Sequence, residues 1–515
     1  MHPRNPYNEA LDFKLLASKY PPLQAHVNQN GGIDFLDPAA QRALTKAILK
    51  TDFDLDVELP DDRLCPPVPN RLNYVLWVEG IVEATSKFTN PSRGVSGLDV
   101  GTGASAIYPL LCCRQNPIWE MFATEIDPTS LSCAQRNVST NALDGRIHLS
   151  RATANDSDSS SPSSHTFGPL FADPNLEIGF TMCNPPFYSS AAEIHTSKTE
   201  KEDEAFSVCT GSANEMIYSS PSSSSSAAAS SSPSPSPYAE CEREGGEVGF
   251  VARMVRESLV IRERCRWYTS MLGKMSSVPK IVGLLKVVGI TNYIVTQFIQ
   301  GQTRRWALGW SVGGWWRLPD TISRLSHLPS SHSLATIQPA RTTLEYSLDK
   351  DPTVVLHDTL EGMKHGGILE VEKVTSPTGV VVEFLVKARE NIWSRAARRK
   401  MKQKAMQAHP ATPADKTGDP SDGTRKRKRD VDEGQGGSNT ARKKGRVDSN
   451  HPKAPEQDEY KMICTVSLSA LTGELGEAAS KRWTLRMQWV YGKDEDREMF
   501  EGFASHIERK VSQGA

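Results

Sequence analysis

The tetrapeptide Asn184-Pro185-Pro186-Phe187 carries the most specific chemical signal in the sequence. An amine conjugated to a purine is a poor nucleophile, and two acceptors aimed at its hydrogens would free its lone pair. The Asn184 side-chain oxygen and the Pro185 carbonyl are such acceptors, and the two prolines would hold them rigidly. Phe187 offers an aromatic face on which an extruded base could stack. The pattern favours chemistry on an amine of this kind over the structural alternative, a proline turn that caps a strand.

A second candidate site is the run DVGTGAS, residues 99–105. Gly101 and Gly103 stand where an expected strand turns into a helix that begins at Ser105, so the backbone there can approach a ligand and direct amides at it. Glu125 follows Gly101 by 24 residues and ends the next expected strand, where a carboxylate can accept both hydroxyls of an adenosine ribose. Together they predict a nucleoside-type cofactor, and on these residues alone NAD remains open.

A parallel sheet is needed to position both sites. Strand-like runs alternate with helical ones, the strands at 97–100, 119–126 and 178–183 and the helices from 105 and over 128–141. Further along, we expect a helix over 250–265, a strand over 266–272, a helix over 278–288 and a hairpin of strands 293–299 and 305–310. Open parallel sheets bind ligands at the carboxyl ends of their strands, where both sites fall.

The composition excludes several classes of protein. Lys and Arg number 60 against 61 Asp and Glu, so a surface for nucleic acid must come from local basic clusters. Nine cysteines without a C-x-x-C pair, and no secretory leader, suit a reducing compartment and argue against a zinc module. No apolar run approaches the roughly 20 residues of a membrane span. We expect a soluble intracellular protein without a metal.

Low-complexity stretches divide the chain. Residues 154–169 and 188–244 are rich in small polar residues, and 401–457 mixes charge, Gly and Pro, so we expect two disordered insertions and a disordered basic linker. The remainder forms two blocks, residues 1–315 and residues 345–400 joined with 458–512. In the second block VVEFLVKAR, MICTVSLSAL and TLRMQWVYG predict strands, and 474–482 and 496–510 predict helices, which together make a small α+β module.

The first block resembles the methyltransferase-like protein 16 family, the eukaryotic U6 small nuclear RNA adenine-N6 methyltransferases, which are related to bacterial 23S ribosomal RNA adenine-N6 methyltransferases. The matching stretches lie in order over residues 1–312: MHPRNPYNEALDFKLLASKYP, DPAAQRALTKAIL, VPNRLNYVLWVE, GLDVGTGASAIYPLL, ATEID, MCNPPF, RWYTSMLGK and QGQTRRWALGWS. The resemblance implies an α/β fold, a Rossmann-like class I methyltransferase sheet with an antiparallel closing hairpin, followed by the small C-terminal module.

The resemblance also implies S-adenosyl-L-methionine as cofactor and direct methyl transfer without a metal. The implied cofactor contacts are Arg71, Gly101, Gly103, Ser105, Glu125 and Asn184, and the adenine would be held by Asn184, Pro185, Pro186 and Phe187. Taken alone, Arg71 would be read as a surface charge. Because Asn184 cannot act as a base, we expect proximity and electrostatics to set the rate.

RNA contacts are implied for the basic N-terminal segment and for the late hairpin, which points to Arg4, Arg304 and Arg305. At Gln302 the sequence departs from the arginine expected there, which weakens the hairpin contact. Lys14 and Lys19 suit RNA contacts and solvated helix charges equally. The C-terminal module resembles the family's RNA-binding region only loosely, and a stabilising domain is its alternative.

Two basic clusters, residues 425–429 and 442–446, predict a nuclear localisation signal or phosphate-contacting tails, with a solubilising tail as the alternative. We therefore expect a nuclear enzyme, also compatible with the cytoplasm, that forms N6-methyladenosine in U6 RNA. We expect it to be a monomer, because no heptad or exposed apolar repeat suggests a partner. The alternatives are an adenine-N6 methyltransferase of ribosomal RNA, other structured RNA or DNA, a glutamine methyltransferase, and an RNA-binding module with little turnover.

Overall fold

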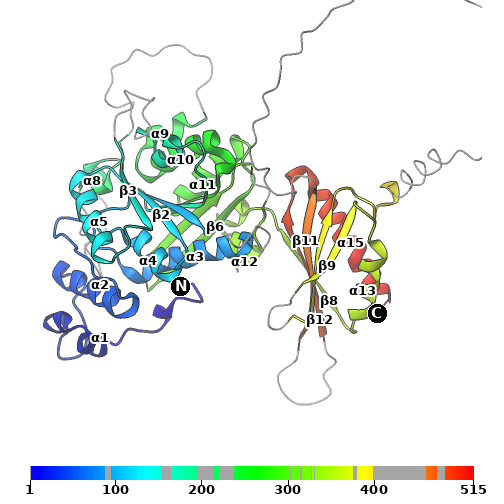
Figure 1. Cartoon of the computed structure of the whole chain (residues 1–515), viewed down its shortest axis with the longest axis horizontal. Coiled ribbons are helices and arrows are strands. Elements are labelled where there is room, and N and C mark those ends of the chain that lie inside the picture. The colour runs from blue at the N-terminus through cyan, green and yellow to red at the C-terminus, as the bar shows by residue number, and fades with distance from the viewer. Residues whose placement is uncertain are drawn as a thin grey trace, which may run out of the picture. The chain divides into compact units, whose positions relative to one another are not determined.

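The structure is a computed structural model. It describes residues 2–86, 94–153, 164–194, 213–219, 237–301, 303–313, 316–325, 328–329, 331–374, 380–397, 399, 460–471 and 482–514. The chain divides into two compact units (Figure 1). The first comprises Met1–Tyr346 with Cys464–Ser467 and Leu485–Glu495, and the second comprises the other residues from Ser347 onward.

A seven-stranded sheet forms the centre of the first unit, with the strand order β3-β2-β1-β4-β5-β7-β6. Its strands are β1 Ser96–Val100, β2 Glu120–Glu125, β3 Ile147–Arg151, β4 Ile178–Cys183, β5 Cys265–Leu272, β6 Tyr293–Gln300 and β7 Thr303–Trp310. Strands β1 to β5 pair in parallel, whereas β7 runs antiparallel to both β5 and β6. The predicted sheet and its closing hairpin are confirmed.

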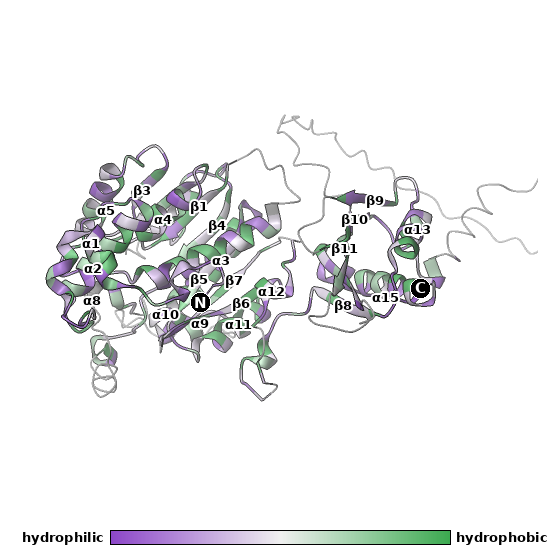
Figure 2. Ribbon diagram, turned by 90° about the horizontal axis from the view of Figure 1, so that it is seen from below, coloured by the Kyte–Doolittle hydropathy of each residue, from purple (hydrophilic) through white to green (hydrophobic). Residues whose placement is uncertain are grey.

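Helices cover both faces of this sheet (Figure 1). They are α1 Phe13–Lys19, α2 Pro38–Phe53, α3 Val68–Ser86, α4 Ile107–Gln115, α5 Pro128–Thr140, α6 Gly168–Ala172, α8 Ala213–Met216, α9 Ala239–Glu244, α10 Gly246–Ile261, α11 Ser277–Val287 and α12 Asp320–Ser323. Strand β5 illustrates the double burial, because Trp267 and Met271 join the hydrophobic cluster of α2, α3 and α4, whereas Tyr268 and Leu272 join that of α10 and α11. Hydrophobic residues therefore run through α3 and the central strands (Figure 2).

The low-complexity stretches are shorter than predicted. Residues 164–169, placed in the first expected insertion, are described, and Phe167 is fully buried in the cluster of α10 and α11. Within the second, residues 188–194, 213–219 and 237–244 are described, and helices α8 and α9 form there. The prediction of disorder over all of 154–169 and 188–244 is thus wrong for these segments. Apolar residues within them pack against the rest of the unit, and the average composition of each long stretch gave no sign of this.

The second sheet has the strand order β8-β12-β11-β10-β9. Its elements are β8 Thr343–Leu348, α13 Thr353–Met363, β9 Leu369–Val374, β10 Val382–Ala388, β11 Met462–Leu471, β12 Arg482–Tyr491 and α15 Arg497–Gly514. Helix α15 buries Phe500, Phe503, Ile507 and Val511 at helical spacing and packs beside α13 (Figure 1).

In this module the three predicted strands and the predicted helix over 496–510 are found, and β8, α13 and β9 were not predicted. The helix predicted over 474–482 lies outside the described residues, except for Arg482, which begins β12. The linker 401–457 with both basic clusters also lies outside them. Among the helices that the structure does describe, none has the length and apolar character of a membrane span.

Candidate active site

A cavity of about 480 Å³ opens at the carboxyl ends of β1, β2 and β4. The predicted cofactor residues come together in it, and its lining includes Arg71, Gly101, Gly103, Ser105, Glu125 and Asn184. Pro185 and Pro186 line it too, whereas Phe187 is not among the lining residues. The two candidate sites of the sequence are therefore parts of one cavity.

The glycine loop shapes one wall of the cavity. Gly101 and Gly103 have φ angles of 72° and 65°, in the left-handed region that favours glycine, and a Cβ on either would meet no atom within 4 Å. The amides of Gly101 and Thr102 donate to the carbonyl of Thr124, at 3.0 and 2.9 Å. These two amides are thus committed to the next strand, and that of Gly103 to Glu125, so none of the three is free to bind a ligand as we expected. Helix α4 begins at Ile107, two residues later than predicted.

Glu125 is held in place by three backbone amides. Its Oε2 accepts from Gly103 N at 2.8 Å, and its Oε1 accepts from Ile126 N at 2.8 Å and from Asp127 N at 2.9 Å. Burial raises the pKa of this carboxyl, and the three amides act in the opposite direction. A carboxylate has about four acceptor sites, and these amides take three of them, both of those on Oε1 and one on Oε2. One site on Oε2 is left for a ribose hydroxyl, and a second hydroxyl would have to share Oε1 with an amide.

Arg71 comes from α3 and is buried, so its reading as a surface charge does not hold. Its Nη1 donates to the Tyr108 hydroxyl and to Asn184 Oδ1, both at 3.0 Å. Its Nε is buried and has no hydrogen-bond partner among the described residues. A cationic side chain with an unused donor at a cavity wall is suited to bind a carboxylate.

The tetrapeptide follows β4 directly, as predicted. The amide of Cys183, at the end of the strand, donates to the Tyr74 hydroxyl at 3.2 Å, which ties the strand end to α3. Asn184 points its Oδ1 at Arg71. Phe187 lies beside the cavity, and the guanidinium carbon of Arg305 is 5.7 Å from the centroid of its ring. Strand β7 therefore reaches the aromatic residue of the predicted catalytic motif.

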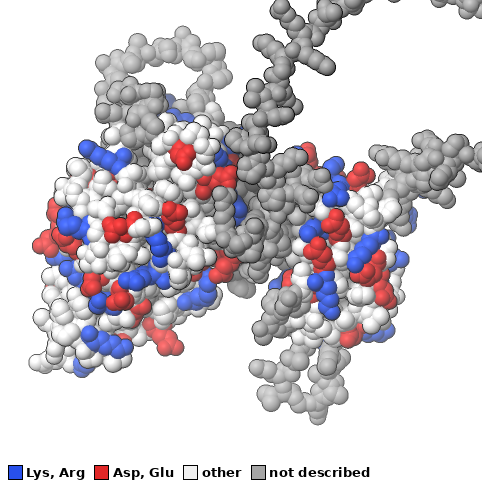
Figure 3. Space-filling view, in the orientation of Figure 1, with Lys and Arg blue, Asp and Glu red and all other residues white. Residues whose placement is uncertain are grey.

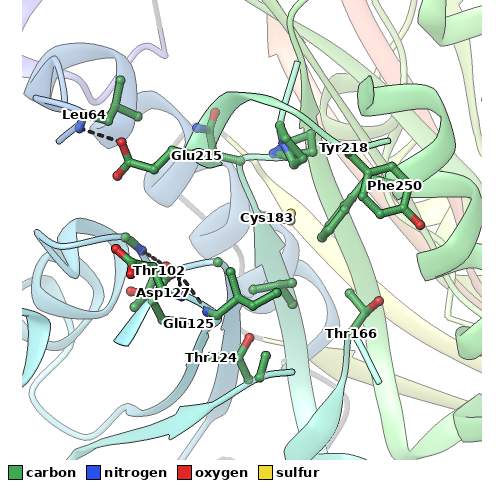
Figure 4. A pocket seen from close by; sticks show the side chains of 18 of the residues that line it. Leu64, Thr102, Thr124, Glu125, Asp127, Thr166, Cys183, Glu215, Tyr218 and Phe250 are labelled. Carbon is green, nitrogen blue, oxygen red and sulfur yellow. Dashed lines mark hydrogen bonds between the residues drawn. The ribbon is translucent and has the colours of Figure 1, made fainter. Parts of the chain in front are cut away.

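Several lining residues were missed by the sequence analysis, among them Thr166, Glu215, Tyr218, Phe250 and Arg253. Figure 4 shows Glu215 across the cavity from Glu125, with its carboxylate accepting from the Leu64 amide at 3.2 Å. Tyr218 and Phe250 form an edge-to-face pair with centroids 5.3 Å apart. The apolar runs TFGPLF and EMIY, at 166–171 and 215–218, were the available signal inside the serine-rich stretches.

Asp99 is a buried acid beneath the glycine loop that the sequence analysis did not single out. Both of its carboxylate oxygens and the Thr102 hydroxyl lie buried without a well-formed hydrogen bond to any described residue. Burial, reinforced by the charge of Glu125, raises the pKa of Asp99 to about 7. Arg71 lines the cavity and keeps an unused donor there, whereas Asp99 is fully buried below the loop and is not among the lining residues.

The residues predicted to contact RNA differ in their surroundings. Arg4 pairs with Glu79 at 3.4 Å and with Glu83 at 3.0 Å, so carboxylates of α3 offset its charge. Lys14, Lys19 and Arg304 are exposed, the first two on α1 and the third on β7. Within the described ranges, no three His, Cys, Asp or Glu side chains are grouped so that they could hold a metal ion.

Comparison with known proteins gives consistent matches over the first unit. A family model described as RNA methyltransferase matches residues 1–313. The RNA N(6)-adenosine-methyltransferase mettl16 of Danio rerio is 36% identical over 318 residues, which are 60% of this chain and 59% of that protein. The U6 small nuclear RNA (adenine-(43)-N(6))-methyltransferase of Schizosaccharomyces pombe is 34% identical over 374 residues, 72% of this chain and 83% of that protein.

Among solved structures, the hMettl16 catalytic domain in complex with MAT2A 3'UTR hairpin 1 is 34% identical, with a TM-score of 0.48. That match covers 60% of this chain and 95% of that chain. The family model ends within the first unit, at residue 313, whereas the match to the Schizosaccharomyces pombe protein covers more of the chain. This chain spans about six tenths of the length of the fish relative.

Proposed function

Because the chain belongs to the RNA methyltransferase family, we propose that it is an S-adenosyl-L-methionine-dependent RNA adenine-N6 methyltransferase. The observation that carries this proposal is the meeting of Asn184 and Pro185 with Arg71 and Glu125 in one cavity. A cofactor site without acceptors for an amine would be compatible with many transferases. The acceptors on Asn184 and Pro185 favour methyl transfer to an amine.

The cavity fits this cofactor at both of its ends. Glu125 would accept the ribose hydroxyls, and Arg71 would hold the carboxylate of the methionine part. S-adenosyl-L-methionine, when bound, supplies a methyl group on a positively charged sulfur. Arg71 and Glu125 are both buried, and a ligand that filled the cavity beside them would keep water from these contacts and so strengthen them.

The chain's own residues would prepare the amine of the target adenine. The Asn184 side-chain oxygen and the Pro185 carbonyl would accept its two hydrogens, which frees the nitrogen lone pair. Since Asn184 has no basic group at neutral pH, the proton would leave to water after transfer. Asn184 Oδ1 accepts a hydrogen bond from Arg71, which orients this acceptor in the cavity.

Structured RNA, with U6 small nuclear RNA first, is the substrate that we propose. The names of the relatives in Schizosaccharomyces pombe and Danio rerio support it, because one acts on U6 RNA and the other on RNA adenosine. Lys and Arg are interspersed with Asp and Glu on the face in Figure 3, so the RNA contacts must come from particular residues. Arg305 at Phe187, exposed Arg304, and Lys14 and Lys19 on α1 are the candidates.

We further propose a monomer that resides in the nucleus. The support is the pair of basic clusters at 425–429 and 442–446, whose composition suits an import signal. Replacing the basic residues of both clusters by glutamine should move a fluorescently tagged protein to the cytoplasm. Unchanged nuclear accumulation would contradict this role for the clusters, and light scattering of the pure protein tests the monomer.

Methyl transfer from labelled cofactor tests the activity. We expect label in U6 RNA transcribed in vitro, none in a copy whose target adenine is guanine, and none with the Asn184→Ala variant. Label in both RNAs would place the target elsewhere, and label in a release factor instead of RNA would favour a glutamine methyltransferase. If both ligands bind without transfer, the protein is an RNA-binding module.

A further inference from the structure

Gly273, between β5 and α11, lies against the ring of Phe187. A Cβ added at this glycine would come within 2.8 Å of Phe187 Cδ1 and 3.0 Å of Cε1, closer than side chains pack, and would lie 3.2 Å from Glu247 Oε2. The φ angle of Gly273 lies outside the left-handed region, so the backbone there does not require glycine. The absence of a side chain at position 273 therefore serves the space that the ring occupies.

Glu247 prevents the loop from giving way. This buried carboxylate, in the first turn of α10, accepts from Gly273 N at 2.6 Å, from Lys274 N at 3.0 Å and from Ser277 Oγ at 2.5 Å. Moving the loop away from the ring would leave a buried carboxylate without its donors, which is costly. An added Cβ at position 273 would press hardest on the ring of Phe187 and less on the Glu247 carboxylate, so we expect the ring to move.

The chain on the far side of the tetrapeptide is just as closely packed. At Gly246, whose φ angle is 53°, a Cβ would meet the carbonyl oxygen of Phe187 at 3.1 Å and the amide of Ser189 at 3.2 Å. The amide of Gly246 donates to the carbonyl of Tyr218 at 2.8 Å. The backbone of Phe187 thus lies close against Gly246, so we expect its ring to respond by rotating.

We propose that Gly273, held by Glu247, is a positioning residue that sets the place of the Phe187 ring and thereby the stacking of the target adenine. This inference rests on the proposed adenine-N6 methyltransferase function. Neither Gly273 nor Phe187 lines the cofactor cavity, so a change at Gly273 acts on the base and not on the cofactor.

The test is Gly273→Ala with Gly283→Ala as the matched control. Gly283 lies exposed in α11, and a Cβ there would meet nothing within 4 Å, so the control makes the same change without a contact. We expect Gly273→Ala to lower kcat/KM for U6 RNA by on the order of ten- to a hundredfold, the scale for a catalytic geometry displaced by about 1 Å. Affinity for S-adenosylhomocysteine, measured by calorimetry, should match that of the control.

A Phe187→Ala background separates positioning from a general structural effect. With the ring removed, adding Gly273→Ala should cost no further rate in single-turnover methylation at excess enzyme. A loss of the same size in both backgrounds, or equal rates for Gly273→Ala and Gly283→Ala, would overturn the inference.

An inactive wild type would refute the proposed function and not the placement of the ring. Crystal structures of the wild type and of Gly273→Ala then decide the placement without any activity. A displaced Phe187 ring is expected, and an unchanged ring would overturn the inference.

Discussion

Asp99 makes the stability of the ligand-free protein depend on pH in an unusual direction. Its pKa in the folded protein is about 7, against 3.8 for an ordinary aspartate, because burial penalises its charge. Between these two values the folded protein binds a proton that the unfolded chain does not. The free energy of unfolding should therefore fall as the pH rises from about 4 to about 7.

The size of the expected fall in the free energy of unfolding follows from the pH range between these two pKa values. From pH 5 to pH 8 the carboxyl titrates over about two pH units, and at about 1.4 kcal/mol per unit this lowers the free energy of unfolding by about 3 kcal/mol. In Asp99→Asn this contribution disappears, so the variant and the wild type should be similar in stability at pH 5 and should diverge by pH 8, with the variant more stable.

Urea denaturation of wild type, Asp99→Asn and Asp349→Asn at pH 5, 6, 7 and 8 measures this difference. Asp349 is exposed and serves as the control for the chemical change. Glu247, whose pKa is shifted by burial and by partners other than Asp99, should titrate alike in all three proteins and cancel in the comparison. The charges of Glu125 and Asp99 act on each other, so the measured difference includes their interaction. If the wild type and Asp99→Asn keep a constant difference in stability over this range, the reasoning about the buried charge is wrong.

Three further changes test contacts of the site. Arg71→Ala removes a buried charged donor and should weaken binding of S-adenosylhomocysteine by on the order of ten- to a hundredfold in calorimetry, and equal affinity would exclude a carboxylate contact. Glu215→Ala breaks its bond to the Leu64 amide and should speed dissociation of the same ligand severalfold in stopped-flow experiments. Asn137→Ala leaves its bonds to Glu58 and Ala104 unmade, so chemical denaturation should show a loss of about 2–4 kcal/mol.

The sheet and the cavity floor were predictable because their signals are local. Alternating apolar strands and helical runs define β1, β2, β4 and the hairpin, and the spacing from Gly101 to Glu125 spans one helix and one strand. Topology then brings the strand ends together, since parallel strands share one carboxyl edge. For this reason Asn184 could be assigned to the same cavity as Glu125 before the structure was known.

Contacts that depend on tertiary packing could not be predicted in this way. The amides of Gly101 and Thr102 turn to Thr124 on the neighbouring strand, which no property of the run DVGTGAS reveals. Glu215 belongs to the short run EMIY, residues 215–218, inside a long serine-rich stretch. The average composition of that stretch predicts disorder, so the run was not recognised as part of the site. Gly273 does not have a left-handed backbone conformation, and the neighbours that leave no room for a side chain there, the Phe187 ring and the Glu247 carboxylate, are distant in the sequence.

The site tolerates a low-complexity stretch next to its catalytic motif because the chain is fastened on both sides of it. Tyr188 exchanges backbone hydrogen bonds with Met216 and Tyr218 at 2.9 Å, and the Tyr218 carbonyl accepts from Gly246. The tetrapeptide thus lies between β4 and Tyr188, which is held by these hydrogen bonds. Its geometry depends on the two attachments and not on how many residues lie between Tyr188 and Met216. Since the entropy of closing a loop grows only with the logarithm of its length, long sequence between such anchors costs little stability. The same hydrogen bonds place Glu215 at the cavity, so a segment that its composition predicts to be disordered supplies part of the cavity wall.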